Sequence, residues 1–200
     1  HRRVILPQLS ASGVSAFEVK KRSEFTVEFG PIRARDIPTF MATGKATSEM
    51  RRVRFDLKDR LVLIPVEIEQ ALLPMIAAAL TLYFLGGIIS VMAVLAAVLA
   101  GTALFPILLP WIPTKDFCAK GFILGILAAM PFALVFFAGN QSSALWMKTA
   151  FASRFPLLMA PVTSYFALNF TGSTPFTSRS GVRREIFRYM PFLAIVFVVG

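Results

Sequence analysis

The longest feature in the pattern of hydrophobic and polar positions is a stretch without any charged side chain between Glu69 and Lys115. A helix that spans a bilayer needs about 20 predominantly apolar residues. The stretch therefore has room for two spans, and the glycine pair Gly86-Gly87 is the natural position for a hairpin between them. We expect these two spans at about 68–85 and 88–109.

Apolar segments continue to the end of the chain, and polar turns separate them. Residues 121–147 again lack charged side chains, and a loop rich in Ser, Thr, Gly and Arg covers residues 171–188. Lys148 and Arg154, with Trp146 beside them, have the composition of an interfacial segment. The pattern predicts an all-α transmembrane bundle of about five helices, with four as the alternative. The further spans are expected at about 119–138, 155–170 and 187–200.

The first 60 residues have a different pattern, which is typical of a soluble α/β protein. Residues 4–6 form a short apolar run, and residues 25–29 alternate apolar with polar positions, as half-buried strands do. Between them, Ser12 is a candidate N-cap for a helix that continues to Arg22. Strand, helix and strand in this order predict a fragment of an α/β sheet. The expected domains are a soluble part, 1–60, and a transmembrane helical part, 61–200.

The charge balance fits the same division. The chain is 56% hydrophobic and 16% charged, with a net charge of +10, which suits a membrane protein or a nucleic-acid-binding protein. The cations gather at about 51–60, 115–120 and 179–188, which lie on one side of the membrane if the spans are as predicted. The positive-inside rule then predicts that the soluble part is cytoplasmic and that the C-terminus lies outside. Nucleic-acid binding is disfavoured, because no recognition motif accompanies the cations.

Motifs with well-defined chemistry are absent from the sequence. It contains no GxGxxG, Walker A, CxxC, HExxH or GxSxG pattern. His1 is the only histidine and Cys118 the only cysteine, so no catalytic residue is assigned and a disulfide scaffold is excluded. Cys118 lies between Lys115 and Lys120, and two nearby cations could make its thiol a better ligand for a soft metal such as Hg(II). The alternative is an inert residue at a helix interface.

Two polar segments are candidate binding sites. The loop at 169–185 combines hydroxyl groups, glycines and arginines, which could bind an anion or dock a partner. The alternative is a solvated connector in which Ser180 caps the next helix. Residues 6–14 join a strand to a helix, where open α/β sheets bind ligands, although an ordinary turn has the same pattern. Glu67 and Glu69 mark either an ion path or side chains solvated at the membrane surface.

Several short segments carry a resemblance to a known family. In the soluble part they are Ile5-Leu6-Pro7-Gln8-Leu9, Gly13-Val14, Glu18-Val19-Lys20-Lys21-Arg22-Ser23, Phe29-Gly30-Pro31-Ile32-Arg33-Ala34 and Met50-Arg51-Arg52-Val53-Arg54-Phe55. With the loop from Asn169 to Val182, they resemble the membrane-bound mercury-methylation corrinoid protein family. The likeness covers most of the chain. A wider relative is the corrinoid iron–sulfur protein of the acetyl-CoA pathway.

The resemblance implies a corrinoid-dependent methyltransferase with a Rossmann-like corrinoid-binding domain, of which residues 1–60 would be the C-terminal part. A cobalamin-type corrinoid, which contains cobalt, would pass a methyl group from a methyl-folate-type donor to Hg(II), giving methylmercury. A ferredoxin-like protein with two [4Fe–4S] clusters would return the cobalt to its reduced state. The family's cap-helix cysteine lies in an Asn-x-Trp-Cys-Ala-Ala-Gly-Lys motif that this sequence lacks. We expect that motif upstream of His1, in a protein of which these residues are a fragment.

The resemblance also assigns roles to individual residues. The residues expected to contact the corrinoid are Pro7, Gln8, Leu9, Ser12 and Gly13. The residues expected to dock the corrinoid domain or a partner are Asn169, Thr171, Gly172, Thr174 and Thr177. Ser10 and Ser12 stand where relatives have Gly and Pro, which predicts a turn of different shape. Two other functions stay open: a transporter or channel with a small cytoplasmic domain, and a membrane anchor for a redox or one-carbon complex.

Overall fold

The computed structural model describes residues 2–139, 144–174 and 179–200, without the side chain of Arg179. It is 77% helical. The chain divides into two compact units, His1–Arg54 and Phe55–Gly200, and each is described by itself. The division lies a few residues before the boundary that the sequence predicts at residue 60.

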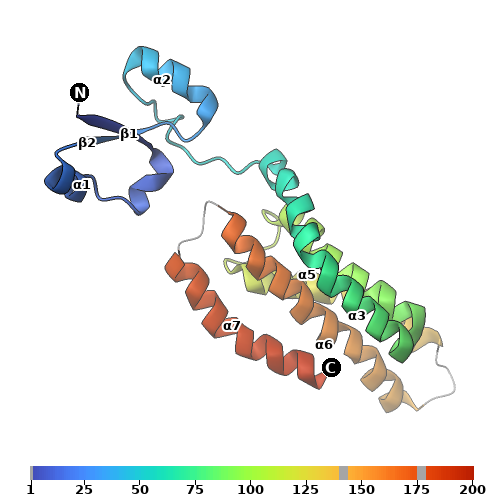
Figure 1. The fold of residues 1–200 in the computed structure, drawn as a ribbon. Coiled ribbons are helices and arrows are strands. Elements are labelled where there is room, and N and C mark those ends of the chain that lie inside the picture. Colours follow the sequence, from blue (N-terminus) through green and yellow to red (C-terminus); the bar gives the residue numbers. More distant parts are fainter. Residues whose placement is uncertain (1, 140–143, 175–178) are drawn as a thin grey trace. The chain divides into compact units, whose positions relative to one another are not determined.

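The first unit is built around a two-stranded parallel sheet (Figure 1). Pro7 lies opposite Gly30, so both strands end at the same edge of the sheet. Phe40, with 3% exposure, is the one large hydrophobic side chain that is buried among the described residues of this unit. The elements are β1 (Arg3–Pro7), a 3-10 helix (Gln8–Ser12), α1 (Ala16–Ser23), β2 (Thr26–Gly30), a 3-10 turn (Ala34–Asp36) and α2 (Ile37–Thr43).

Ser15, and not Ser12, caps α1. The Ser15 hydroxyl accepts a hydrogen bond of 3.3 Å from the backbone N–H of Glu18. Ser and Glu three residues apart form the spacing of a capping box, which fixes the start of the helix. The Ser12 hydroxyl instead donates to the carbonyl of Leu9 at 3.3 Å, inside the preceding 3-10 helix.

The prediction of a Rossmann-like domain is wrong. In the described part of the first unit the sheet has two strands and is not extended by a third. Apolar side chains of this unit therefore stay in contact with solvent, such as Ile5 with 43% exposure. A strand–helix–strand pattern specifies one local unit, whereas a doubly wound sheet needs further strands and helices on both faces.

The second unit is helical in all of its described regular structure. α5 and α6 make its most extensive helix pair, and α7 lies along α6 (Figure 1). Its elements are α3 (Leu57–Leu99), a π-helical turn (Ala100–Leu104), α4 (Phe105–Leu108), α5 (Phe117–Gly139), α6 (Leu145–Asn169), a 3-10 helix (Phe170–Ser173) and α7 (Arg179–Val199).

α3 reverses its direction at Gly87. This residue has φ 67° and ψ −162°, a conformation that is not helical and that favours glycine. Arg60 donates a hydrogen bond of 2.8 Å to the carbonyl of Pro106, whereas an unbroken helix would hold the two residues about 69 Å apart. α3 therefore consists of two limbs that fold back on each other. Gly87 belongs to the glycine pair at which the sequence predicts a hairpin.

Two helical segments of the described chain are long and apolar enough to cross a membrane, Leu57–Leu108 and Phe117–Gly139. They support membrane association, but the prediction of about five spans is wrong. The first two expected spans fall on the two limbs of Leu57–Leu108, which is counted as one helical segment although it reverses at Gly87. α6 contains Lys148 and Arg154, and the first half of α7 contains several arginines, so neither helix has the uniformly apolar composition of a span.

Glycines bring α5 and α6 into close contact. A Cβ atom on Gly121 would lie 2.4 Å from the Cβ of Ala167, and one on Gly125 would lie 2.5 Å from the Cα of Ala160. Both distances are shorter than any van der Waals contact, so a larger residue would push the helices apart. A Gly-x-x-x-Gly spacing is the one that lets membrane helices approach closely.

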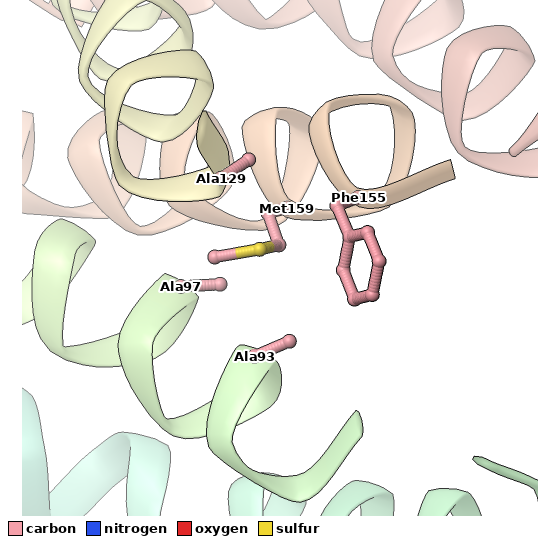
Figure 2. Close-up of a cluster of buried hydrophobic side chains, with 5 residues drawn as sticks. All are labelled: Ala93, Ala97, Ala129, Phe155 and Met159. Carbon is pink, nitrogen blue, oxygen red and sulfur yellow. The ribbon is translucent and has the colours of Figure 1, made fainter. Parts of the chain in front are cut away.

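Small side chains also line the contact between α6 and the second limb of α3. The limb contributes Ala93 and Ala97, with Ala129 of α5 nearby. Figure 2 shows Phe155 and Met159 extending from α6 toward this limb. The two larger residues thus fill only part of the space that the alanines leave.

Candidate functional site

The turn after β1 brings together all five residues expected to contact a corrinoid. Pro7 ends the strand, the 3-10 helix Gln8–Ser12 follows, and the Gly13 N–H donates to the Ser10 carbonyl at 3.0 Å. The Ser10 hydroxyl donates in turn to the Pro7 carbonyl at 2.7 Å. Because Pro7 lies opposite Gly30 in a parallel pair, the turn lies at the carboxyl edge of the sheet. These hydrogen bonds give the turn a defined shape.

The turn combines an unpaired polar group with an exposed apolar side chain. The buried Oε1 of Gln8 has no hydrogen-bond partner among the described residues, and an unsatisfied acceptor of this kind costs about 1–3 kcal/mol. Leu9 beside it is 48% exposed. A Cβ atom on Gly13 would meet only the Ser10 carbonyl, at 4.0 Å, so the backbone there is open to close approach. Two side chains of this kind can hold a ligand that carries amide donors beside an apolar edge.

The threonines of the expected docking segment shape a turn at the end of α6. Thr171 and Thr174 are 1% and 8% exposed. The Thr171 hydroxyl donates to the carbonyl of Leu168 at 2.6 Å, and the Thr174 hydroxyl donates to the carbonyl of Thr171 at 3.1 Å. These two residues therefore hold the 3-10 helix that follows α6 and do not present their hydroxyl groups to a partner.

Asn169 and Gly172 are the members of this segment that lie at the surface. A Cβ atom on Gly172 would meet nothing within 4 Å, so a partner can approach its backbone. Ser173 ties the turn to α3, because its hydroxyl donates to Glu67 Oε1 at 2.8 Å. Glu67 is only 6% exposed, so it is not a carboxylate solvated at the membrane surface. Thr177 lies outside the described residues.

Cys118 lies inside the interface between α5 and α6. It is 1% exposed, and its Sγ lies 2.9 Å from the hydroxyl oxygen of Ser164. The Ser164 hydroxyl donates to the Cys118 carbonyl at 2.7 Å, which leaves the thiol as the donor between the two side chains. Lys120 donates to the Leu109 carbonyl at 2.8 Å. Within the described residues no cluster of three or more His, Cys, Asp or Glu could hold a metal ion, and the sequence offers no second thiol.

α7 supplies the acceptor for the first turn of α5, a contact that the sequence pattern does not reveal. Glu185 Oε2 accepts hydrogen bonds from the backbone N–H groups of Phe117 at 3.1 Å and Cys118 at 3.3 Å. One turn later, Tyr189 donates to Asp116 Oδ2 at 2.7 Å. Burial raises the pKa of Glu185 above 4.5 and the charge of Asp116 adds to the rise, while the two N–H groups act in the opposite direction.

A cavity of about 640 Å³ lies between α6 and both limbs of α3. Most of its lining is apolar, and the two charged residues in it are Glu67 and Arg154. Asn169 also lines it, about 22 Å from Arg154 along the axis of α6. The hydrophobic pattern does not predict this cavity, because small residues such as Ala93 and Ala97 read as ordinary members of an apolar helix.

The structure thus separates the expected site residues into three places. One is the turn after β1 in the first unit, and the others are the end of α6 and the buried thiol of the second unit. No family model, curated protein or solved structure matches this chain.

Proposed function

We propose that this chain acts in corrinoid-dependent methyl transfer to Hg(II), which forms methylmercury. One structural observation carries the proposal. Segments that resemble the mercury-methylation corrinoid protein family, separated by more than 20 residues in the sequence, meet at the carboxyl edge of the sheet, where Pro7 lies opposite Gly30. Ligands of parallel α/β structures bind at this kind of edge.

The chain's own residues provide the contacts for the cofactor. The Oε1 of Gln8 is buried without a partner among the described residues, and after a change of rotamer it accepts a hydrogen bond from an amide group on the corrinoid rim. Leu9 covers an apolar edge of the ring, and the Ser10 hydrogen bond to Pro7 holds the turn in place. When bound, a corrinoid supplies a cobalt-held methyl group that a soft, electrophilic ion such as Hg(II) accepts.

The remaining parts of the proposal concern location and partners. The apolar helical segments hold the protein in a bacterial or archaeal cytoplasmic membrane, with the basic first unit on the cytoplasmic side. A methyl-folate-type donor system supplies the methyl group, and a ferredoxin-like protein with two [4Fe–4S] clusters supplies electrons. The exposed Asn169 and Gly172 offer a contact surface for the protein partner.

Corrinoid binding tests the assignment of the turn. The chain is purified in detergent and titrated with hydroxocobalamin, and bound corrinoid is followed by its visible absorption after gel filtration. We expect saturable binding by the wild-type chain. The Gln8→Ala variant should bind about 3- to 10-fold more weakly, as expected for the loss of one hydrogen bond. Leu9→Asp should weaken binding further, because it puts a charge against the apolar edge.

Lys45→Ala is the matched control, because Lys45 is exposed in the same unit and lies outside the turn. Its affinity should equal that of the wild-type chain. The absence of bound corrinoid in the wild-type chain would refute the proposal. Equal affinities for the wild type, Gln8→Ala and Leu9→Asp would refute the assignment of the turn.

A further inference from the structure

The cavity of the second unit has the form of a site for one hydrocarbon chain. Its volume of about 640 Å³ lies in the range of roughly 300–1,000 Å³ that small-molecule sites occupy. Along α6 the lining extends from Arg154 to Asn169, which is about 22 Å of helix. One leaflet of a bilayer contributes about 15 Å of hydrocarbon, so a single acyl chain fits within this length.

The cavity exists because short side chains face long ones across it. Ala93 and Ala97 lie on the second limb of α3, opposite Phe155 and Met159 of α6 (Figure 2). Ala78 lines the cavity from the first limb. The reversal of α3 brings its two limbs together, and both limbs and α6 belong to the second unit. The cavity is therefore built into the helical fold of this unit.

Arg154 gives the cavity one cationic end. The guanidinium carbon lies 4.8 Å from the ring centroid of Phe136 and 5.1 Å from that of Phe155. Among the described residues no carboxylate forms a salt bridge with Arg154. The two phenylalanine rings give the guanidinium cation some stabilisation. They leave the hydrogen-bond donors of Arg154 available to an anion.

Glu67 makes the opposite end unsuitable for an anion. Its carboxylate lines the cavity, is 6% exposed and already accepts the hydrogen bond of Ser173. A second negative group beside it would be repelled in surroundings of low dielectric constant. Trp146 is 70% exposed near the start of α6, and tryptophan is enriched at the headgroup level of membranes. An amphiphile with a negative headgroup therefore fits with that group at Arg154.

We propose that the second unit binds one anionic phospholipid in this cavity, with the phosphate at Arg154 and an acyl chain along α6. The site is independent of methyl transfer, because it uses no residue of the turn after β1. The lipid completes the packing between α6 and the two limbs of α3. Bound lipid therefore stabilises the helical unit against unfolding.

Native mass spectrometry of the full chain tests this proposal. Delipidated protein in detergent is titrated with phosphatidylglycerol or phosphatidylcholine of the same acyl composition, and thermal unfolding is recorded in parallel. We expect one phosphatidylglycerol per chain, with an affinity about 10-fold higher than that of phosphatidylcholine and a matching rise in Tm. Arg154→Gln should abolish the preference, whereas Lys148→Gln, a change on the same helix outside the cavity lining, should retain it.

A pair of neighbouring substitutions tests whether the lipid occupies the cavity. Ala78→Phe fills the space between the limb and α6, while Ala77→Phe puts the same side chain on an exposed position outside the lining. Ala78→Phe should lose the bound lipid with its helical circular dichroism unchanged, and Ala77→Phe should bind as the wild type does. Lipid binding by Ala78→Phe at wild-type affinity would overturn the assignment of the cavity. Equal binding of phosphatidylglycerol and phosphatidylcholine would overturn the role of Arg154. The absence of any bound lipid would overturn the site itself.

Discussion

Tyr189 of α7 donates a hydrogen bond of 2.7 Å to Asp116, the residue that precedes α5. One turn earlier on α7, Glu185 accepts hydrogen bonds from the first N–H groups of α5. The N-terminal turn of a helix has unpaired N–H donors and a partial positive charge, and a carboxylate satisfies both. α7 thus holds the start of α5 in position from 68 residues away along the chain.

The half-buried carboxyl group of Glu185 makes stability depend on pH. Because burial raises its pKa above 4.5, folding favours the protonated form, and this contribution is lost as the pH rises through the folded-state pKa. Glu185→Gln keeps an acceptor oxygen and carries no charge. We expect its Tm relative to wild type to increase as the pH is raised from 4.5 toward 8, measured by thermal unfolding in detergent. Glu69→Gln, at an exposed position, should show no such trend. A constant difference between Glu185→Gln and wild type would contradict the role of burial.

The glycines between α5 and α6 should not tolerate a methyl group. In Gly125→Ala the new Cβ would lie 2.5 Å from the Cα of Ala160, so the helices must separate. We expect the free energy of unfolding to fall by about 1–3 kcal/mol. Gly139→Ala is the control, because nothing lies within 4 Å of its added Cβ. Denaturant titration followed by circular dichroism compares them, and equal stability of the two variants would show that the close approach is absent.

Arg60 should stabilise the end of the long helical segment. It is 7% exposed and donates through Nη1 to the carbonyls of Pro106 and Ile107 at 2.8 and 3.2 Å. Arg60→Met leaves these carbonyls without a charged donor, which should cost about 1.5–3 kcal/mol. Lys58→Met changes an exposed cation nearby and should cost less than 0.5 kcal/mol, a typical surface effect of about that size. Unfolding curves of the two variants that coincide would contradict this role.

The Cys118 thiol should be protected in the folded chain. With 1% exposure and a contact to Ser164, it can react only after local opening. We expect maleimide to label it on the order of 100-fold more slowly than a cysteine at the exposed Ser153, introduced as Ser153→Cys in a Cys118→Ala background. Mass spectrometry follows the labelling. Equal rates would mean that the thiol is accessible and available to Hg(II).

The sequence predicts the helices and turns that local residue patterns determine. It does not predict the features that depend on long-range contacts. The span expected at about 119–138 coincides with α5, and the glycine pair at 86–87 contains the residue where α3 reverses. Hydropathy and glycine conformation are local properties, so they can be read along the chain. The number of spans cannot be predicted in this way, because α6 combines a buried apolar face with Arg154 and several hydroxyl groups.

The candidate site also combines features that are local in the sequence with features that depend on long-range contacts. The turn from Pro7 to Gly13 is visible in the sequence as a cluster of small and polar residues after an apolar strand. The size of its sheet is not visible, because a strand–helix–strand pattern does not state how many strands follow. The pairing of Glu185 with α5 and the cavity beside Arg154 also depend on tertiary packing. The close contact of Gly121 and Gly125 with α6 is different, because their Gly-x-x-x-Gly spacing is visible in the sequence.

Methylmercury formation tests the proposed function most directly. The natural polypeptide that carries these residues is expressed with its ferredoxin-like partner, supplied with reduced corrinoid and a methyl-folate donor, and incubated with Hg(II). We predict methylmercury from the wild-type protein and from Cys118→Ala, because that thiol is buried between helices of the second unit, and a loss of product in Leu9→Asp. The absence of methylmercury from wild-type protein that holds bound, reduced corrinoid would contradict the proposed activity.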